Sequence, residues 1–101
     1  MNEVLLEVSR ERAAQDEKWG EQNHPDGTHK DLASMANLRR NQCDRAAAEG
    51  CVTFRHILAE EVAEAFAEED SESLRAELIQ VAAVAVSWIE SIDRRNKGPQ
   101  P

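Results

Sequence analysis

Apolar residues recur every three or four positions through the second half of the chain, which is the spacing of one face of an α-helix. Phe54, Leu58 and Val62 share one side of a predicted helix, and Leu74 and Val81 share one side of the next. Helix-forming residues are abundant, and no run of alternating β-branched residues predicts a strand. The sequence therefore predicts an all-α fold.

Residues that start and stop helices divide the chain into four predicted segments. Gly50 is a typical C-terminal stop, Thr53 suits an N-cap, and Asp70 with Ser71 separates the last two helices. One domain over residues 1–97 is expected, followed by a tail, residues 98–101, that should fray. The predicted helices run from about Glu3 to Lys18, Leu32 to Glu49, Thr53 to Glu69 and Ser71 to Arg95.

The apolar content is thin for a self-sufficient core. Alanine supplies fifteen of the forty-one hydrophobic residues in this 101-residue chain. A chain of this length buries only about 60 to 65% of its unfolded surface when alone. The run from Val81 to Val86 is apolar nearly all round, which is typical of a helix buried on more than one side. We expect a helical bundle, with about four helices per chain, that is completed by homo-oligomerisation.

Charge and hydropathy exclude several classes of protein. A formal net charge of −8 disfavours binding to a nucleic acid polymer. The longest nearly uncharged apolar stretch, Leu78–Ile89, has twelve residues, whereas a membrane span needs about 20. No secretory signal is visible, and two cysteines, Cys43 and Cys51, cannot form a dense disulfide framework. A cytoplasmic protein with no membrane partner is expected.

Glutamates follow the border of the apolar faces on the last two predicted helices. Glu61 and Glu64 are one helical turn apart, and Glu60 adjoins them. Glu77 faces the same space if the two helices form an antiparallel hairpin. Converging carboxylates repel one another, and a hard divalent cation such as Mg²⁺, or Mn²⁺ in its place, neutralises them. A solvated acidic face is the alternative interpretation of the same pattern.

Two stretches together carry a family resemblance. The sequence EEVAEAF, which contains Glu64, is followed by ELIQV, which begins at Glu77; twelve residues separate these two glutamates. The segment KWGEQNHPDG lies upstream. This arrangement resembles the MazG-like, all-α nucleoside triphosphate pyrophosphohydrolases, in particular the short members found in phages and actinobacteria. The family signature is Glu-x-x-Glu on one helix and Glu-x-x-Asp on the next. Glu61 and Glu64 match its first half, and Glu77 opens its second half.

The resemblance implies a MazG-like helical bundle that forms dimers or dimers of dimers. Glu61, Glu64 and Glu77 would hold Mg²⁺, and Glu60 would be a further ligand or the base that activates water. The implied reaction cleaves a nucleoside triphosphate to its monophosphate and pyrophosphate. Gln80 occupies the position of the family's metal-ligand Asp and offers only a neutral carbonyl oxygen to the metal. A nucleotide-binding protein that does not cleave its ligand therefore stays open as an alternative.

Six further side chains are candidates for contacts to the nucleotide. An indole at the start of the loop can stack on a base or cover one end of the bundle. The sequence HPDG is also typical of a plain turn, and cations near a helix C-terminus are favoured by the helix dipole alone. The second predicted helix adds further donors, and these are Asn37, Arg39, Arg40 and Asn41. The six candidates are Lys18, Trp19, His24, Asp26, Arg94 and Arg95.

Overall fold

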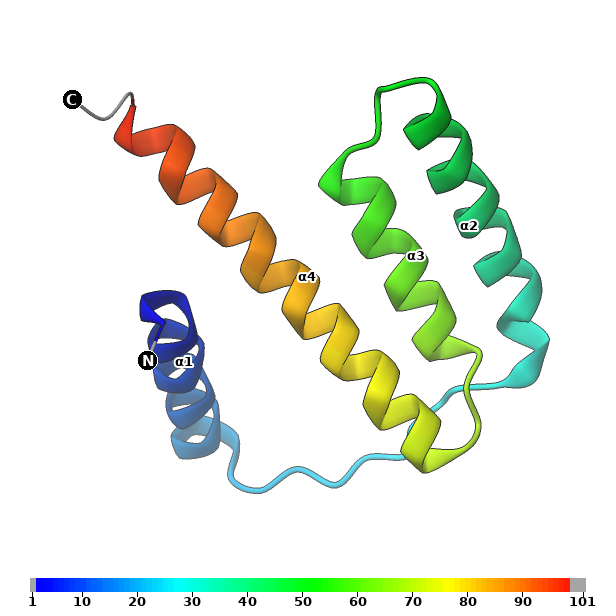
Figure 1. Ribbon diagram of the computed structural model, residues 1–101. Coiled ribbons are helices and arrows are strands. Elements are labelled where there is room, and N and C mark those ends of the chain that lie inside the picture. The colour runs from blue at the N-terminus through cyan, green and yellow to red at the C-terminus, as the bar shows by residue number, and fades with distance from the viewer. Residues whose placement is uncertain (1, 99–101) are drawn as a thin grey trace.

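The computed structural model describes residues 2–98, which form four α-helices and no β-strand (Figure 1). The predicted all-α class is confirmed. Of the tail expected to fray, residues 99–101 lie outside the described part of the chain. The helices are α1 (Glu3–Trp19), α2 (Ala33–Ala48), α3 (Phe54–Phe66) and α4 (Ser71–Lys97), and a short 3-10 helix, η1 (Lys30–Leu32), precedes α2.

The third helix ends at Phe66, so the prediction that it continues to Glu69 is wrong. The backbone N–H groups of Ala67 and Glu68 donate to the carbonyls of Glu64 and Ala65, three residues back, at 3.2 and 3.1 Å. These tighter bonds close the helix. Asp70 then accepts a hydrogen bond from the Ser73 N–H at 2.9 Å and caps the start of α4. A four-residue connection therefore reverses the chain between α3 and α4.

The start of α3 is fixed by a capping box. The Thr53 hydroxyl accepts from the His56 N–H at 3.3 Å, and the His56 imidazole accepts from the Thr53 N–H at 3.1 Å. Just upstream, Gly50 has a φ of 73°, a left-handed conformation that favours glycine. The predicted stop at Gly50 and cap at Thr53 are confirmed, and they turn the chain from α2 into α3.

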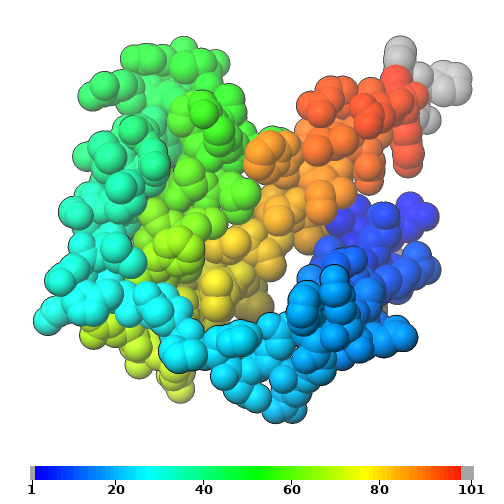
Figure 2. All heavy atoms as spheres, turned by 180° about the vertical axis from the view of Figure 1, so that it is seen from behind, coloured from blue at the N-terminus to red at the C-terminus, as the bar shows by residue number. Residues whose placement is uncertain are grey.

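Helices α2, α3 and α4 lie side by side in chain order, each antiparallel to its neighbour (Figure 1). Among the helices, α1 contacts only α4, on the side away from α3. The Asn2 side chain at the start of α1 donates to the Glu90 carboxylate of α4 at 2.6 Å. Towards its C-terminus α4 diverges from α3, and the stacked rings of Phe54 and Trp88, with centroids 5.7 Å apart, bridge the two helices. Figure 2 shows the divergence as a notch between α3 and α4.

The core is as thin as the composition predicts. No large side chain among residues 2–98 is fully buried. The principal extents are 50 × 44 × 19 Å, so the molecule is less than two helix diameters thick. No helix in the described part of the chain is long and apolar enough to cross a bilayer. Four of the buried apolar residues are alanines; the set is Val4, Ala36, Cys43, Ala46, Ala63, Ala65 and Leu74.

Candidate metal centre

The hairpin of α3 and α4 brings three carboxylates together. Glu61 and Glu64 lie one turn apart on α3, and Glu77 comes from the second turn of α4. Each of the three offers a carboxylate oxygen within 4.8 Å of the others, and all three side chains are half-buried. The convergence follows from the short connection between the helices, because it forces them to pack antiparallel with adjacent borders facing each other. The prediction that these three side chains lie close together is confirmed.

The three negative charges destabilise one another. Burial raises the pKa of Glu61, and the neighbouring charges of Glu64, Glu77 and Glu60 raise it further. Burial also raises the pKa of Glu77, followed by the charges of Glu64 and Glu68 and a hydrogen bond with Glu64. Both groups therefore hold their protons more tightly than an exposed glutamate does. A cation placed among them would reverse this preference.

One carboxylate oxygen in the cluster has no partner. Glu77 Oε2 is buried and makes no hydrogen bond to the described residues. An anionic oxygen withdrawn from water costs free energy unless a donor or a cation satisfies it. Three carboxylates with an unsatisfied oxygen match the donor set that hard divalent cations such as Mg²⁺ prefer. The residues present therefore fit a divalent cation.

Arg40 of α2 was not predicted as part of this site, yet it contacts the cluster. Its guanidinium lies 3.3 Å from Glu64 Oε1 and 3.8 Å from Glu60 Oε1. Glu60 thus faces α2, where burial raises the pKa of the Cys43 thiol and the neighbouring Glu60 carboxylate raises it further. One positive charge consequently sits on the rim of the acidic cluster. In the sequence Arg40 was only one of several donors on its helix, and no local spacing distinguishes it.

The remaining candidates are not gathered around the carboxylates. Gln80 lies one turn beyond Glu77 on α4, and its side chain is exposed. Trp19 is 62% exposed at the end of α1, and the Lys18 ammonium lies 4.8 Å from its ring centroid. Helix α1 contacts α4 on the side away from α3, whereas the cluster lies where α4 faces α3.

The loop and the end of α4 are equally separate from the carboxylates. The His24 Nε2 pairs with the Gln22 side chain at 3.0 Å, and Asp26 is exposed. Arg94 and Arg95 are exposed on the last turn of α4. They lie about 25 Å from Glu77 along the helix, at about 1.5 Å per residue. Within one chain the structure thus assembles the candidate cation ligands but not the candidate nucleotide contacts.

Fold and site together define an all-α protein with a half-buried carboxylate cluster suited to a divalent cation. No protein-family model, no curated protein and no solved structure matches the chain.

Proposed function

We propose that the chain is a MazG-like, Mg²⁺-dependent nucleotide pyrophosphohydrolase that cleaves a nucleoside triphosphate to its monophosphate and pyrophosphate. The observation that carries the proposal is the convergence of Glu61, Glu64 and Glu77, with their oxygens within 4.8 Å of one another. Phosphate groups are recognised by divalent cations held on carboxylates, and Mn²⁺ prefers the same oxygen donors. Glu61 and Glu64 match the Glu-x-x-Glu half of the family signature, and Glu77 matches the first position of the Glu-x-x-Asp half, where Gln80 replaces the Asp; the three matching positions support the same assignment.

Each acidic residue has a role in this proposal. Glu61, Glu64 and Glu77 hold the cation, which when bound polarises a phosphoryl oxygen and offsets negative charge. Glu60 lies next to the cluster and accepts a proton from the attacking water. Arg40 pairs with both Glu60 and Glu64, so it orients these two carboxylates and partly offsets their charge. Exposed cations and aromatics elsewhere on the chain, Trp19 among them, bind the nucleotide from a second copy.

We further propose that the active form is a homo-oligomer. The Cα radius of gyration is 16.2 Å, against about 13 Å for a compact chain of this length. The accessible surface is 7900 Å², whereas a compact monomer of 11.3 kDa exposes about 5,700 Å². Large apolar side chains account for part of the excess, since Phe66, Leu78 and Ile79 are 53%, 49% and 56% exposed. A second copy covering them would bury an interface of ordinary size.

The test is product analysis with a panel of nucleotides and Mg²⁺. The wild-type chain is expected to release pyrophosphate from at least one nucleoside triphosphate. Glu64→Gln is expected to lose about a hundredfold or more of this rate, because a ligand to the cation and its charge are removed. Glu7→Gln removes the same charge from an exposed position on α1 and is the matched control. Turnover of no nucleotide by the wild type would defeat the proposed activity.

A second candidate function is nucleotide binding without cleavage on the same fold. It is favoured by Gln80, which places a neutral amide where the resembled family has a carboxylate. Calorimetry would then show Mg²⁺-dependent nucleotide binding without pyrophosphate release. Gln80→Asp restores the family's fourth ligand and is expected to confer activity in that case.

A further inference from the structure

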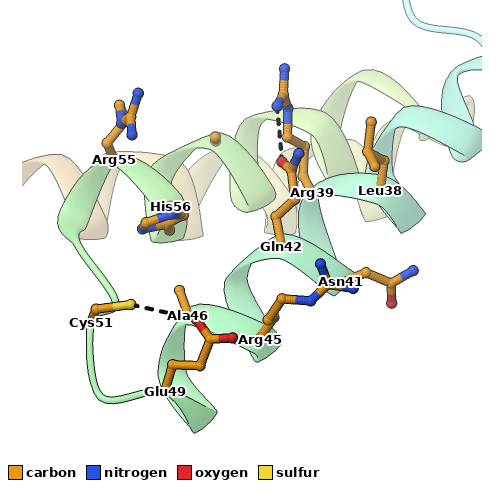
Figure 3. A pocket seen from close by; sticks show the side chains of 11 residues that line it. Leu38, Arg39, Asn41, Gln42, Arg45, Ala46, Glu49, Cys51, Arg55 and His56 are labelled. Atoms are coloured by element: carbon orange, nitrogen blue, oxygen red, sulfur yellow. Dashed lines mark hydrogen bonds between the residues drawn. The ribbon is translucent and has the colours of Figure 1, made fainter.

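A cleft of about 740 Å³ lies between the C-terminal half of α2 and the first turns of α3 (Figure 3). None of the three clustered carboxylates lines it. Its volume is in the range of small-molecule sites, about 300 to 1,000 Å³. Its polar lining consists chiefly of hydrogen-bond donors: Arg39, Asn41, Gln42 and Arg45 from α2, and Arg55 and His56 from α3.

The positive charges of the cleft are not neutralised by the protein. No ion pair joins Arg39, Arg45 or Arg55 to a carboxylate within residues 2–98. The one acidic residue in the lining, Glu49, accepts a weak hydrogen bond from the Cys51 thiol at 4.0 Å. Three guanidinium groups without a carboxylate partner among the described residues therefore line one cleft in a chain whose net charge is −8, and that of Arg39 donates a hydrogen bond to Gln42 Oε1 at 3.0 Å (Figure 3). Their excess positive charge, screened in part by water because Arg45 and Arg55 are exposed, favours an anion in the cleft.

The N-terminus of α3 adds to the positive potential of the cleft, whereas the C-terminus of α2 at the same end carries the opposite partial charge. The first turn of α3 contains no acidic residue and carries Arg55 and His56 beside the partial positive charge of the helix N-terminus. The C-terminal carbonyls of α2 at the same end are already used. Those of Arg45 and Ala46 accept from the backbone N–H groups of Glu49 and Cys51 at 3.0 and 2.9 Å.

We propose that the α2–α3 cleft binds an oligophosphate chain, as an anion site separate from the carboxylate cluster and independent of divalent cations. Guanidinium groups match phosphate oxygens in a planar, two-pronged geometry, and amide donors complete the recognition. Arg45 lines the cleft from α2 and Arg55 lines it from α3. Figure 3 shows the Arg55 side chain directed away from α2, so it must turn toward the cleft for a chain of linked phosphates to contact both guanidinium groups. Inorganic oligophosphates and nucleoside triphosphates present this same chemistry.

The cysteines provide a reporter for the test. Cys51 is exposed in the cleft, whereas Cys43 is buried. Cys51 is alkylated with iodoacetamide in the presence of EDTA, and the extent of alkylation is measured by mass spectrometry. Because EDTA keeps divalent cations away from the carboxylates, the alkylation rate reports occupancy of the cleft alone. Inorganic triphosphate is expected to slow the alkylation of Cys51. In Arg45→Gln/Arg55→Gln, the triphosphate concentration for half protection is expected to rise about a hundredfold, because each guanidinium removed weakens binding about tenfold.

The matched control is Arg10→Gln/Arg75→Gln, which removes the same two charges from exposed positions on α1 and α4 and should leave protection unchanged. ATP run beside triphosphate distinguishes the sources. If ATP protects Cys51 at a lower concentration than inorganic triphosphate does, the cleft recognises a nucleotide. If the two protect equally, the cleft recognises the phosphate chain alone. Protection of the Arg45/Arg55 variant at the wild-type concentration would overturn the proposal. So would equal protection by sulfate at matched ionic strength. The single variant Arg55→Gln repeats the test with one substitution.

Discussion

Replacing Glu77 by glutamine should stabilise the protein when no divalent cation is present and weaken its response to Mg²⁺. Gln has nearly the same shape as Glu, and its amide can donate to the Glu64 carboxylate. The substitution therefore removes a charge without opening a cavity. It also replaces the unpartnered oxygen of Glu77 by a neutral group. Stability in EDTA and stability in Mg²⁺ should consequently change in opposite directions.

The distances in the cluster give the size of the effect. The carboxylate oxygens lie within 4.8 Å of one another, and at that upper limit two unit charges repel by about 0.9 kcal/mol in water and by about 3.5 kcal/mol at an effective dielectric constant of about 20. Glu77→Gln relieves two such pairs. Because the side chains are only half-buried, the low end applies and the expected stabilisation is about 2 kcal/mol. For a domain of this length that raises Tm by about 8 °C.

Mg²⁺ should reverse the order of the two proteins. A cation at about 100 times its Kd stabilises the wild type by about 2.7 kcal/mol. The variant keeps only two carboxylates and should gain far less. Thermal unfolding followed by circular dichroism, in EDTA and in MgCl₂ with NaCl at matched ionic strength, measures both shifts. The control, Glu7→Gln, should follow the wild type. If Glu77→Gln and Glu7→Gln have the same Tm in EDTA, the assigned repulsion is refuted. If MgCl₂ and NaCl change the Tm of the wild type equally, the cation site is refuted.

Three other results are expected. Without divalent cations, Tm should rise as the pH falls from neutral through the raised pKa of Glu61 and Glu77 towards the ordinary glutamate pKa. The reason is that the folded state binds these protons more tightly than the unfolded state does. A fall of Tm over that pH interval, or the same pH dependence in Glu77→Gln, would contradict this expectation. Leu78→Glu should shift the sedimenting species from oligomer to monomer, while Ser9→Glu on α1 should not, and a monomeric wild type would contradict the proposed assembly. Thr53→Ala should lower the unfolding free energy by about 1 kcal/mol in urea titrations, because α3 loses the hydroxyl of its capping box; an unchanged midpoint would show that the cap contributes nothing.

The helices and the acidic cluster were predictable because both depend on local spacing. Gly50 and Thr53 set one turn by their own conformational preferences. Glu61 and Glu64 share a face because they are three residues apart, and the short connection before α4 leaves the antiparallel hairpin as the simple arrangement. Glu77 then needs only to lie on the facing border.

Features that depend on how one helix is rotated against another were not predictable. Arg40 reaches Glu64 and Glu60 only because α2 presents that residue to α3, while the adjacent Arg39 lines the cleft instead. Nothing in the sequence pattern distinguishes Arg39 from Arg40. Likewise, nothing in the spacing around Trp19 indicates that α1 packs on the far side of α4. Such outcomes are decided by the packing of whole faces rather than by periodicity.

The proposed cation site and the proposed assembly are expected to influence each other, because Glu77 directly precedes Leu78 on α4. Leu78 is 49% exposed and is among the residues that a second copy would cover. Covering it also withdraws water from the cluster beside it, and that raises the cost of keeping three carboxylates ionised. A cation bound among them removes this cost. Mg²⁺ binding and association are therefore expected to stabilise each other by linkage. A purely solvating acidic face has no such coupling, because its charges remain in water whether or not the apolar surface is covered.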